Sequence, residues 1–229
     1  MAVITFDLQQ VLPTPRLTTN VSFYKRQLSV YNLGIHESST GKGYMHIWPE
    51  TDGGRGSEDI ASCIFKFVNE EKADDAKHVI AFSDTCGGQN RNFNIAAMWL
   101  YCIIIGKAEL IDHKFMYSGH SFLPNDREYG SIEQKKRQVG MIYVPEDWHN
   151  LVRAARRQNP LVVKEISLND TTFSLNARCI LTFFYLIQNE SYKYTQVPLI
   201  TFYIKCRNKD TQNVCSLIRC LCFTHYPVA

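Results

Sequence analysis

Residues 78–90 read HVIAFSDTCGGQN, an apolar run that ends on Asp84 and is followed by a turn containing Gly87 and Gly88. An apolar run without polar alternation is typical of a strand covered on both faces in a parallel part of a sheet. The two glycines allow a tight turn, and the apolar residues 92–106 are long enough for a buried helix. We therefore expect a strand, turn and helix of an α/β fold.

A second apolar run ends in the same way, since MAVITFD (1–7) closes on Asp7. Ligands of open α/β sheets gather outside the carboxyl ends of strands. We therefore expect Asp7 and Asp84 to meet at one edge of a sheet.

Apolar periodicity predicts the remaining elements. The polar link STGKG suits a hairpin, so the first three strands are expected to form an antiparallel meander. Ser57 is a candidate N-cap for the first helix. Strands are expected at 1–7, 21–37, 44–48, 78–84 and 109–117, and helices at 58–71, 92–106, 124–139 and 145–158. This order predicts an α/β, ribonuclease H-like fold with a mixed five-stranded sheet flanked by helices.

The pattern weakens beyond about residue 159, where VVKEISL, TTFSL, CILTFFYLI and VPLITFYIKC read as short strands. We expect a ribonuclease H-like core at 1–158. Residues 159–229 are expected to form an irregular or β-rich C-terminal extension.

Bulk properties permit several functions and exclude few. A net charge of +3 allows a polyanionic partner without requiring one. No apolar stretch reaches the ~20 residues that cross a bilayer, and the N-terminus lacks the pattern of a signal peptide. We therefore expect an intracellular protein without a membrane partner, whose eight cysteines are mostly reduced thiols. Cys215, Cys220, Cys222 and His225 fit the usual zinc spacings poorly.

A site for two Mg²⁺ or Mn²⁺ ions is the chemistry that strand-end aspartates favour, because these hard cations prefer carboxylate oxygens. Asp7 and Asp84 need a third acid from a helix. We prefer Asp126 at the helix start, where the helix dipole favours a carboxylate and Gly130 allows close approach to the sheet. Glu133 is the alternative, although it lies ~10 Å farther along the helix axis. An aspartate in a first helical turn is also a common cap.

Other side chains could serve such a site. His120 could orient Asp126, protonate a leaving group or touch phosphate. Backbone N–H groups after the glycine turn could receive a phosphate. Cys86 is a weaker candidate nucleophile. Candidate contacts to a nucleic-acid strand are Gln89, Asn90, Arg91, Lys135, Lys136 and Arg137, with Arg153, Arg156 and Arg157 as further basic residues; such clusters are often only a solvated helix face.

The strings FDLQQVLPTP, YNLGIH, FSDTCGGQNRN and GHSFLPNDREYGSIE together resemble an uncharacterised transposon-derived domain family of animals. That family is similar to the ribonuclease H-like catalytic cores of DDE/DDD transposases and integrases. The resemblance covers roughly residues 1–157. It implies catalytic acids at Asp7, Asp84 and Asp126, with His120 close by and Glu133 as the alternative third acid.

The resemblance implies metal-dependent strand cleavage and transfer at DNA ends. With DNA as the expected partner, we expect the protein in the nucleus. No segment precedes the first strand, so we expect no upstream DNA-recognition module. A catalytically inactive or domesticated remnant that binds nucleic acid or protein is the alternative. The sequence does not determine an oligomeric state.

Overall fold

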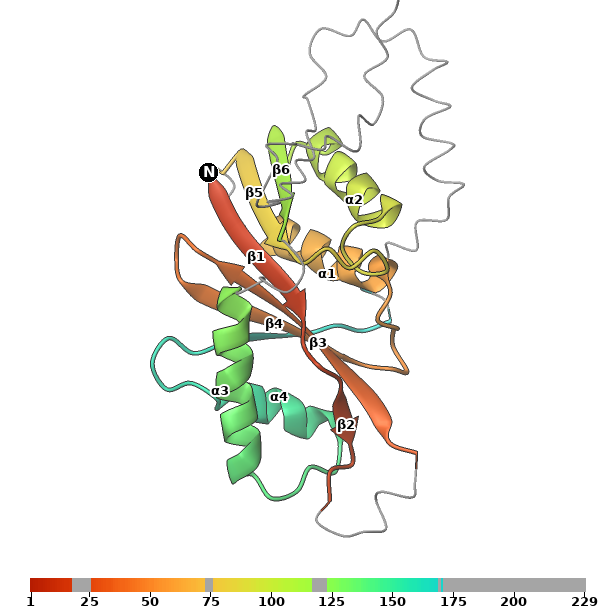
Figure 1. Ribbon diagram of the computed structural model, residues 1–229, viewed down its shortest axis with the longest axis vertical. Helices are drawn as coiled ribbons and strands as arrows, with labels where there is room; N and C mark the ends of the chain where they lie inside the picture. Colours follow the sequence, from red (N-terminus) through yellow and green to blue (C-terminus); the bar gives the residue numbers. More distant parts are fainter. Residues whose placement is uncertain (18–25, 73–75, 117–122, 169, 171–229) are drawn as a thin grey trace, which may run out of the picture.

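The computed structural model describes residues 1–17, 26–72, 76–116, 123–168 and 170, and these form one mixed β-sheet with four helices (Figure 1). The strands are β1 (Ala2–Leu8), β2 (Leu12–Thr14), β3 (Leu28–Glu37), β4 (Lys42–Pro49), β5 (His78–Ser83), β6 (Leu110–Phe115) and β7 (Val162–Glu165). The helices are α1 (Ser57–Glu70), α2 (Phe93–Ile104), α3 (Pro124–Gln138) and α4 (Pro145–Arg153). The predicted α/β class is confirmed.

The sheet has the strand order β6-β5-β1-β3-β4-β7, and β2 pairs with β3. Strand β1 runs parallel to β5, which runs parallel to β6. On its other side β1 is antiparallel to β3, and β3 is antiparallel to β4. The predicted antiparallel meander is therefore confirmed, and Gly41 adopts φ +66° in its hairpin link, as expected for a tight reversal.

The described sheet contains seven strands rather than the expected five. The short β2 was missed because three residues carry no periodic signal. Strand β7 pairs in parallel with β4, and Leu161 and Ile166 beside it are buried. The sheet therefore continues past the expected boundary near residue 159. The further strands expected beyond residue 170 lie outside the described residues.

Some element ends differ from the expected ones. Helix α1 is capped by Gly56, not Ser57, and Asp59 Oδ2 accepts a hydrogen bond of 3.3 Å from Gly56 N. Helix α4 ends at Arg153 rather than at residue 158. Gly87 and Gly88 do not have the positive φ that only glycine adopts readily, so the turn after β5 does not depend on them in this way.

The helices cover the sheet from both sides, and each face has its own apolar core (Figure 1). Side chains of α1 and α2 pack with Ile4 and Phe6 of β1. Side chains of α3 and α4 pack with Met45 and Ile47 of β4. Because successive strand residues point to opposite faces, Thr5 and Asp7 face the side of α3. This alternation decides which polar side chains can reach α3.

Burial in β5 alternates along the strand, which corrects the expectation of cover on both faces. Val79 and Ala81 are fully buried in the core that the sheet forms with α1 and α2. His78, Ile80 and Phe82 point to the other face and are partly exposed. The apolar run was misleading because Ile80 and Phe82 are apolar without being enclosed by the described residues. The predicted parallel pairing is nevertheless confirmed.

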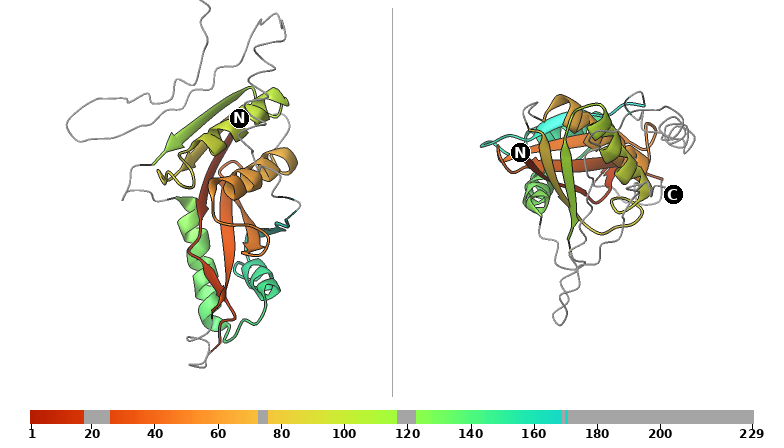
Figure 2. Two further views of the ribbon diagram at one scale, coloured as in Figure 1. Left: turned by 90° about the vertical axis from the view of Figure 1, so that its right-hand side faces the viewer. Right: turned by 90° about the horizontal axis from the view of Figure 1, so that it is seen from above.

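Helix α3 packs tightly against β1 and β3 (Figure 2), and its Glu128 side chain reaches Gly43 on β4. The tight approach is not at Gly130, since a Cβ there would meet nothing within 4 Å. It is at Gly34 and Gly43, where an added Cβ would lie 2.6 Å from Tyr129 Oη and 2.5 Å from Glu128 Cδ respectively. The predicted role of Gly130 was therefore wrong, and the glycines that admit α3 are on the strands.

No helix among the described residues has the length and apolar character needed to cross a membrane.

Candidate functional site

Asp7 and Asp84 lie at neighbouring strand ends on one face of the sheet. The parallel register of β1 and β5 pairs Ile4 with Ala81 and Thr5 with Phe82. Two residues beyond Thr5 and Phe82 are Asp7, near the end of β1, and Asp84, directly after β5. The prediction that these aspartates meet at one edge is consistent with this register.

Asp126 is in the first turn of α3, as expected. Its Oδ2 accepts a 2.9 Å hydrogen bond from Leu123 N, so the carboxylate also caps the helix. The side chain is exposed, unlike its neighbours Asn125 and Glu128, which are fully buried. Asp126 is therefore a helix cap, one of the two roles considered from sequence, and its role as a metal ligand stays a prediction.

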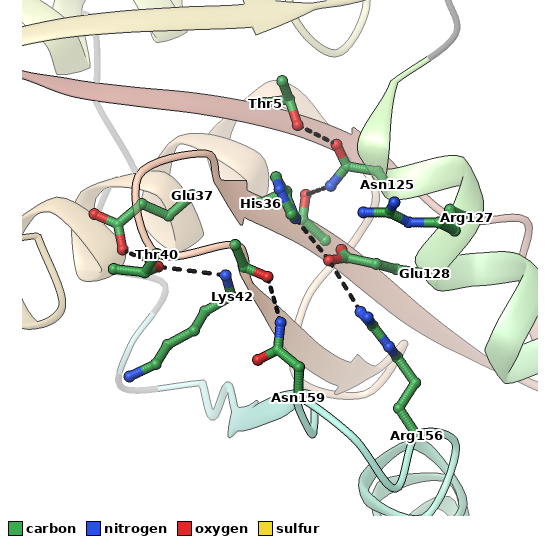
Figure 3. Close-up of polar contacts among 12 residues, drawn as sticks. Thr5, His36, Glu37, Thr40, Lys42, Asn125, Arg127, Glu128, Arg156 and Asn159 are labelled. Carbon is green, nitrogen blue, oxygen red and sulfur yellow. Dashed lines mark hydrogen bonds and ion pairs between the residues drawn. The ribbon is translucent and has the colours of Figure 1, made fainter.

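Two buried polar side chains, Asn125 and Tyr129, fasten the start of α3 to β1 and β3. Figure 3 shows the contacts of Asn125. Asn125 Oδ1 accepts from Thr5 Oγ1 at 2.6 Å, and Asn125 Nδ2 donates to Gly34 O at 2.9 Å. The Tyr129 hydroxyl accepts from Gly34 N at 2.9 Å and donates to the carbonyl of Asp7. Burial raises the pKa of Tyr129 well above its usual value, so the hydroxyl keeps the proton that it donates. These bonds fix Asp126 relative to Asp7.

Glu128 forms a second polar cluster one turn along α3 (Figure 3). The carboxylate is fully buried, and its Oε1 lies 2.7 Å from His36 Nδ1 and 3.7 Å from Arg156 Nη1. Glu128 Oε2 is buried and has no hydrogen-bond partner among the described residues. This cluster joins β3, α3 and the segment after α4.

The electrostatics of the edge centre on Asp7. The pKa of Asp7 is raised from 3.8 to about 6; burial is the largest cause, the negative charges of Asp84 and Asp126 also raise it, and the hydrogen bond from Leu8 N–H lowers it. Asp84 and Asp126 are therefore both close enough to Asp7 to disfavour its negative charge. Glu133 does not contribute to this repulsion; it pairs with Lys136 at 2.8 Å and accepts a 3.4 Å hydrogen bond from Gln9.

Asp7→Asn is expected to stabilise the metal-free protein at pH 8 by on the order of 1–2 kcal/mol. The folded-state pKa is about 6 and the usual value is 3.8, so the folded state binds this proton more tightly than the unfolded state. The ionised carboxylate therefore costs stability above pH ~6, and the cost vanishes below pH ~4.

Urea unfolding in EDTA at pH 8 and pH 4 measures this effect, and Asp52→Asn in a surface turn is the matched control. A gain for Asp7→Asn that is the same at both pH values would show that the raised pKa of Asp7 is not its cause.

A complete metal centre is not assembled in the described residues, where no group of three or more His, Cys, Asp or Glu side chains could hold an ion. Each acid does keep one oxygen for a ligand. Asp7 Oδ1, Asp84 Oδ1 and Asp126 Oδ2 accept hydrogen bonds from their own segments. The second carboxylate oxygens accept none within the described part of the chain.

The loop after β5 is organised around Asp84 and Cys86. Asn90 Nδ2 donates to Asp84 Oδ1 at 2.5 Å, and Cys86 N donates to the same oxygen at 3.1 Å. The Cys86 carbonyl accepts from the N–H groups of Gln89, Asn90 and Arg91. Asn90 is only 2% exposed, so its amide positions Asp84 rather than facing a nucleic-acid strand, while Arg91 is exposed.

The basic candidates lie in different settings. Lys135, Lys136 and Arg137 form the last turn of α3, and Lys136 pairs with Glu133. Arg156 pairs with Glu128, so it is part of the α3 attachment, whereas Arg153 and Arg157 are exposed. Cys86 is exposed, and the contacts that hold its loop come from its backbone.

His120 and the candidate zinc ligands Cys215, Cys220, Cys222 and His225 lie outside the described residues.

Sequence reasoning missed the side chains that attach α3 to the sheet. The helical spacing of Asn125, Glu128, Tyr129 and Ile132 places them on one face, and all are buried. Most of that face is polar, so apolar periodicity gave no signal. The signal that could have found them is polar residues at i, i+3 and i+4 spacing on a helix, together with glycines on the strands that the helix approaches.

Comparison with known protein families, curated proteins and solved structures returned no match for this chain.

Proposed function

We propose that this chain is a ribonuclease H-like, transposase-derived core that cuts and transfers DNA strands with the help of Mg²⁺ or Mn²⁺. One observation carries the proposal. Asp7 and Asp84 end neighbouring parallel strands on one sheet face, and the charge of Asp126 is close enough to raise the pKa of Asp7. Burial and mutual repulsion make such acids a favourable place for a divalent cation.

The order of elements supports the fold that we propose. Strands β1, β3 and β4 are followed by α1, β5, α2, β6 and α3, the order expected of a ribonuclease H-like domain. Strands β2 and β7 are additions to that pattern. The acids lie at the strand ends where ligands of α/β sheets gather.

The donor set fits the metals that we propose, because Asp7, Asp84 and Asp126 each offer a hard carboxylate oxygen that accepts no hydrogen bond from the described residues. Two bound ions would activate the attacking oxygen, stabilise the leaving oxygen and neutralise phosphate charge. Asn90 and Cys86 N hold the Asp84 carboxylate, and Asn125 and Tyr129 hold the start of α3. Gln89, Arg91, Lys135 and Arg137 are the side chains that we propose for contacts with the DNA backbone.

A plasmid-nicking assay tests this function. Supercoiled DNA is incubated with wild type, Asp84→Asn and Asp52→Asn, each with Mg²⁺, Mn²⁺ or EDTA. Wild type and Asp52→Asn are expected to nick DNA only with metal, and Asp84→Asn is expected to fall to the EDTA level. Equal cutting by wild type and Asp84→Asn would refute the assignment.

The second candidate function is a remnant that binds nucleic acid or protein without cutting. It is favoured by the lack, within the described residues, of an assembled group of three metal-binding side chains, and by the capping role of Asp126. Salt-sensitive DNA retention by wild type and Asp84→Asn alike, with no nicking by either, would favour this reading. Because DNA is the partner that we propose, we also propose that the protein acts in the nucleus.

A further inference from the structure

We propose that Trp99, His113 and Ser83 are positioning residues, which form a buried hydrogen-bonded chain that fixes the backbone of Asp84. This inference rests on the proposed function in one respect, namely that Asp84 is one of its acids. The three side chains come from α2, β6 and β5, and each is fully buried.

The chain has three successive hydrogen bonds. Trp99 Nε1 donates to His113 Nδ1 at 3.3 Å. His113 Nε2 lies 2.9 Å from Ser83 Oγ, and Ser83 Oγ donates to the carbonyl of Asp84 at 3.0 Å. The chain thus starts under α2 and ends on the residue that follows β5.

Only one arrangement of protons satisfies all three bonds. An indole nitrogen can only donate, so His113 Nδ1 must accept and carries no proton. The ring proton is therefore on Nε2, which donates to Ser83 Oγ. Ser83 has one hydroxyl proton, and this goes to the Asp84 carbonyl. Because the Trp99 indole can only donate, it fixes which atom donates and which accepts in all three hydrogen bonds.

The surroundings keep the His113 ring neutral and in place. It packs between Phe6 and Phe115, with ring centroids 5.3 Å and 4.2 Å away. Burial lowers the pKa of His113 to about 3, as expected where no charge partner offsets desolvation. A neutral ring in one tautomer is what the chain requires.

Asp84 is then held twice. The buried chain holds its carbonyl from below, and Asn90 and Cys86 N hold its carboxylate from the loop above. Met116 N also donates to the Ser83 carbonyl, which extends the pairing of β5 with β6. The direction in which Asp84 leaves the strand is therefore set in part by fully buried core residues.

An experiment without metal tests the hydrogen-bonded chain of Trp99, His113 and Ser83. Ser83→Ala removes its last link, and Val79→Ala, also buried in β5, is the control for general loss of stability. At matched global stability, amide hydrogen exchange at Asn90 and Arg91 is expected to be about tenfold faster in Ser83→Ala than in Val79→Ala. Imidazole ¹⁵N shifts of the wild type are expected to show the Nε2–H tautomer, and Trp99→Phe is expected to give a tautomer mixture.

Equal exchange in Ser83→Ala and Val79→Ala, or an Nδ1–H tautomer in the wild type, would overturn the inference.

A second arm uses Mn²⁺ alone and separates this inference from the proposed function. In thermal-shift titrations, Ser83→Ala is expected to need about tenfold more Mn²⁺ than wild type for the same shift, with Val79→Ala unchanged. Absence of any Mn²⁺ shift in the wild type would count against the proposed function. The hydrogen-exchange experiment would still test whether the hydrogen bonds of Trp99, His113 and Ser83 position Asp84. A Mn²⁺ response of Ser83→Ala equal to that of wild type would contradict the positioning role.

Discussion

Glu128→Ala is expected to lower the free energy of unfolding by about 3–5 kcal/mol. The Glu128 carboxylate is fully buried between His36 and Arg156, and Arg156 Nη1 is itself buried without a hydrogen-bond partner among the described residues. Removing the acid therefore leaves the largely buried Arg156 side chain without the charge that compensates it. It also loosens the contact of α3 with β3.

Urea unfolding of Glu128→Ala beside Glu133→Ala measures this cost. Glu133 is on the same helix but pairs with Lys136 at a partly exposed position, so its loss is expected to cost less than about 1 kcal/mol. In a Glu128→Ala/Arg156→Met double variant, part of the stability is expected to return, because the orphaned charge is gone. An equal loss of unfolding free energy in Glu128→Ala and Glu133→Ala would show that the buried cluster of Glu128 stabilises the protein no more than a partly exposed ion pair does.

The fold could be predicted where short apolar runs were well defined. Residues 1–7, 44–48 and 78–84 were identified as strands, and the structure places β1, β4 and β5 at nearly the same positions. Pairing of β7 with β4 could not be predicted, because four residues of VVKE carry no long-range signal and their partner is more than 100 residues away. The ribonuclease H-like assignment stays a prediction.

The candidate site was predictable only in part, for a physical reason. Strand ends mark Asp7 and Asp84 directly in the sequence, since a carboxylate after an apolar run is visible. The supports of these acids are buried polar side chains such as Asn125, His113 and Ser83, which look like ordinary surface residues in a sequence. Asn125 bonds Thr5, 120 residues away, and His113 bonds Ser83, 30 residues away, so only the folded chain brings these pairs together.

The close approach of α3 to the sheet was wrongly predicted to depend on a glycine of the helix rather than on glycines of the strands, for a related reason. Gly130 is on the helix and shares a face with Asp126, so sequence spacing pointed to it. The close contact depends instead on which strand residues lack a Cβ, and that follows from the register, which places Gly43 opposite His36. A pair of strand glycines gives no periodic signal of its own.

Gly43→Ala is expected to destabilise the protein by about 3 kcal/mol. An added Cβ would lie 2.5 Å from Glu128 Cδ, and this carboxyl group cannot swing aside because it is fully buried and bonded to His36. The helix α3 must then move away from β4. Gly130→Ala is the matched control: its Cβ meets nothing within 4 Å, and alanine in a helix is expected to raise stability by about 0.5–1 kcal/mol.

A double-mutant cycle shows whether Gly43 and Glu128 act through the same contact. In the Glu128→Ala background the carboxyl group that blocks the new methyl is absent, so Gly43→Ala is expected to lose most of its cost. Urea unfolding of the four proteins gives the coupling energy. If Gly43→Ala is as costly in the Glu128→Ala background as in wild type, the strain comes from elsewhere in β4, and the close approach of α3 does not explain the glycine.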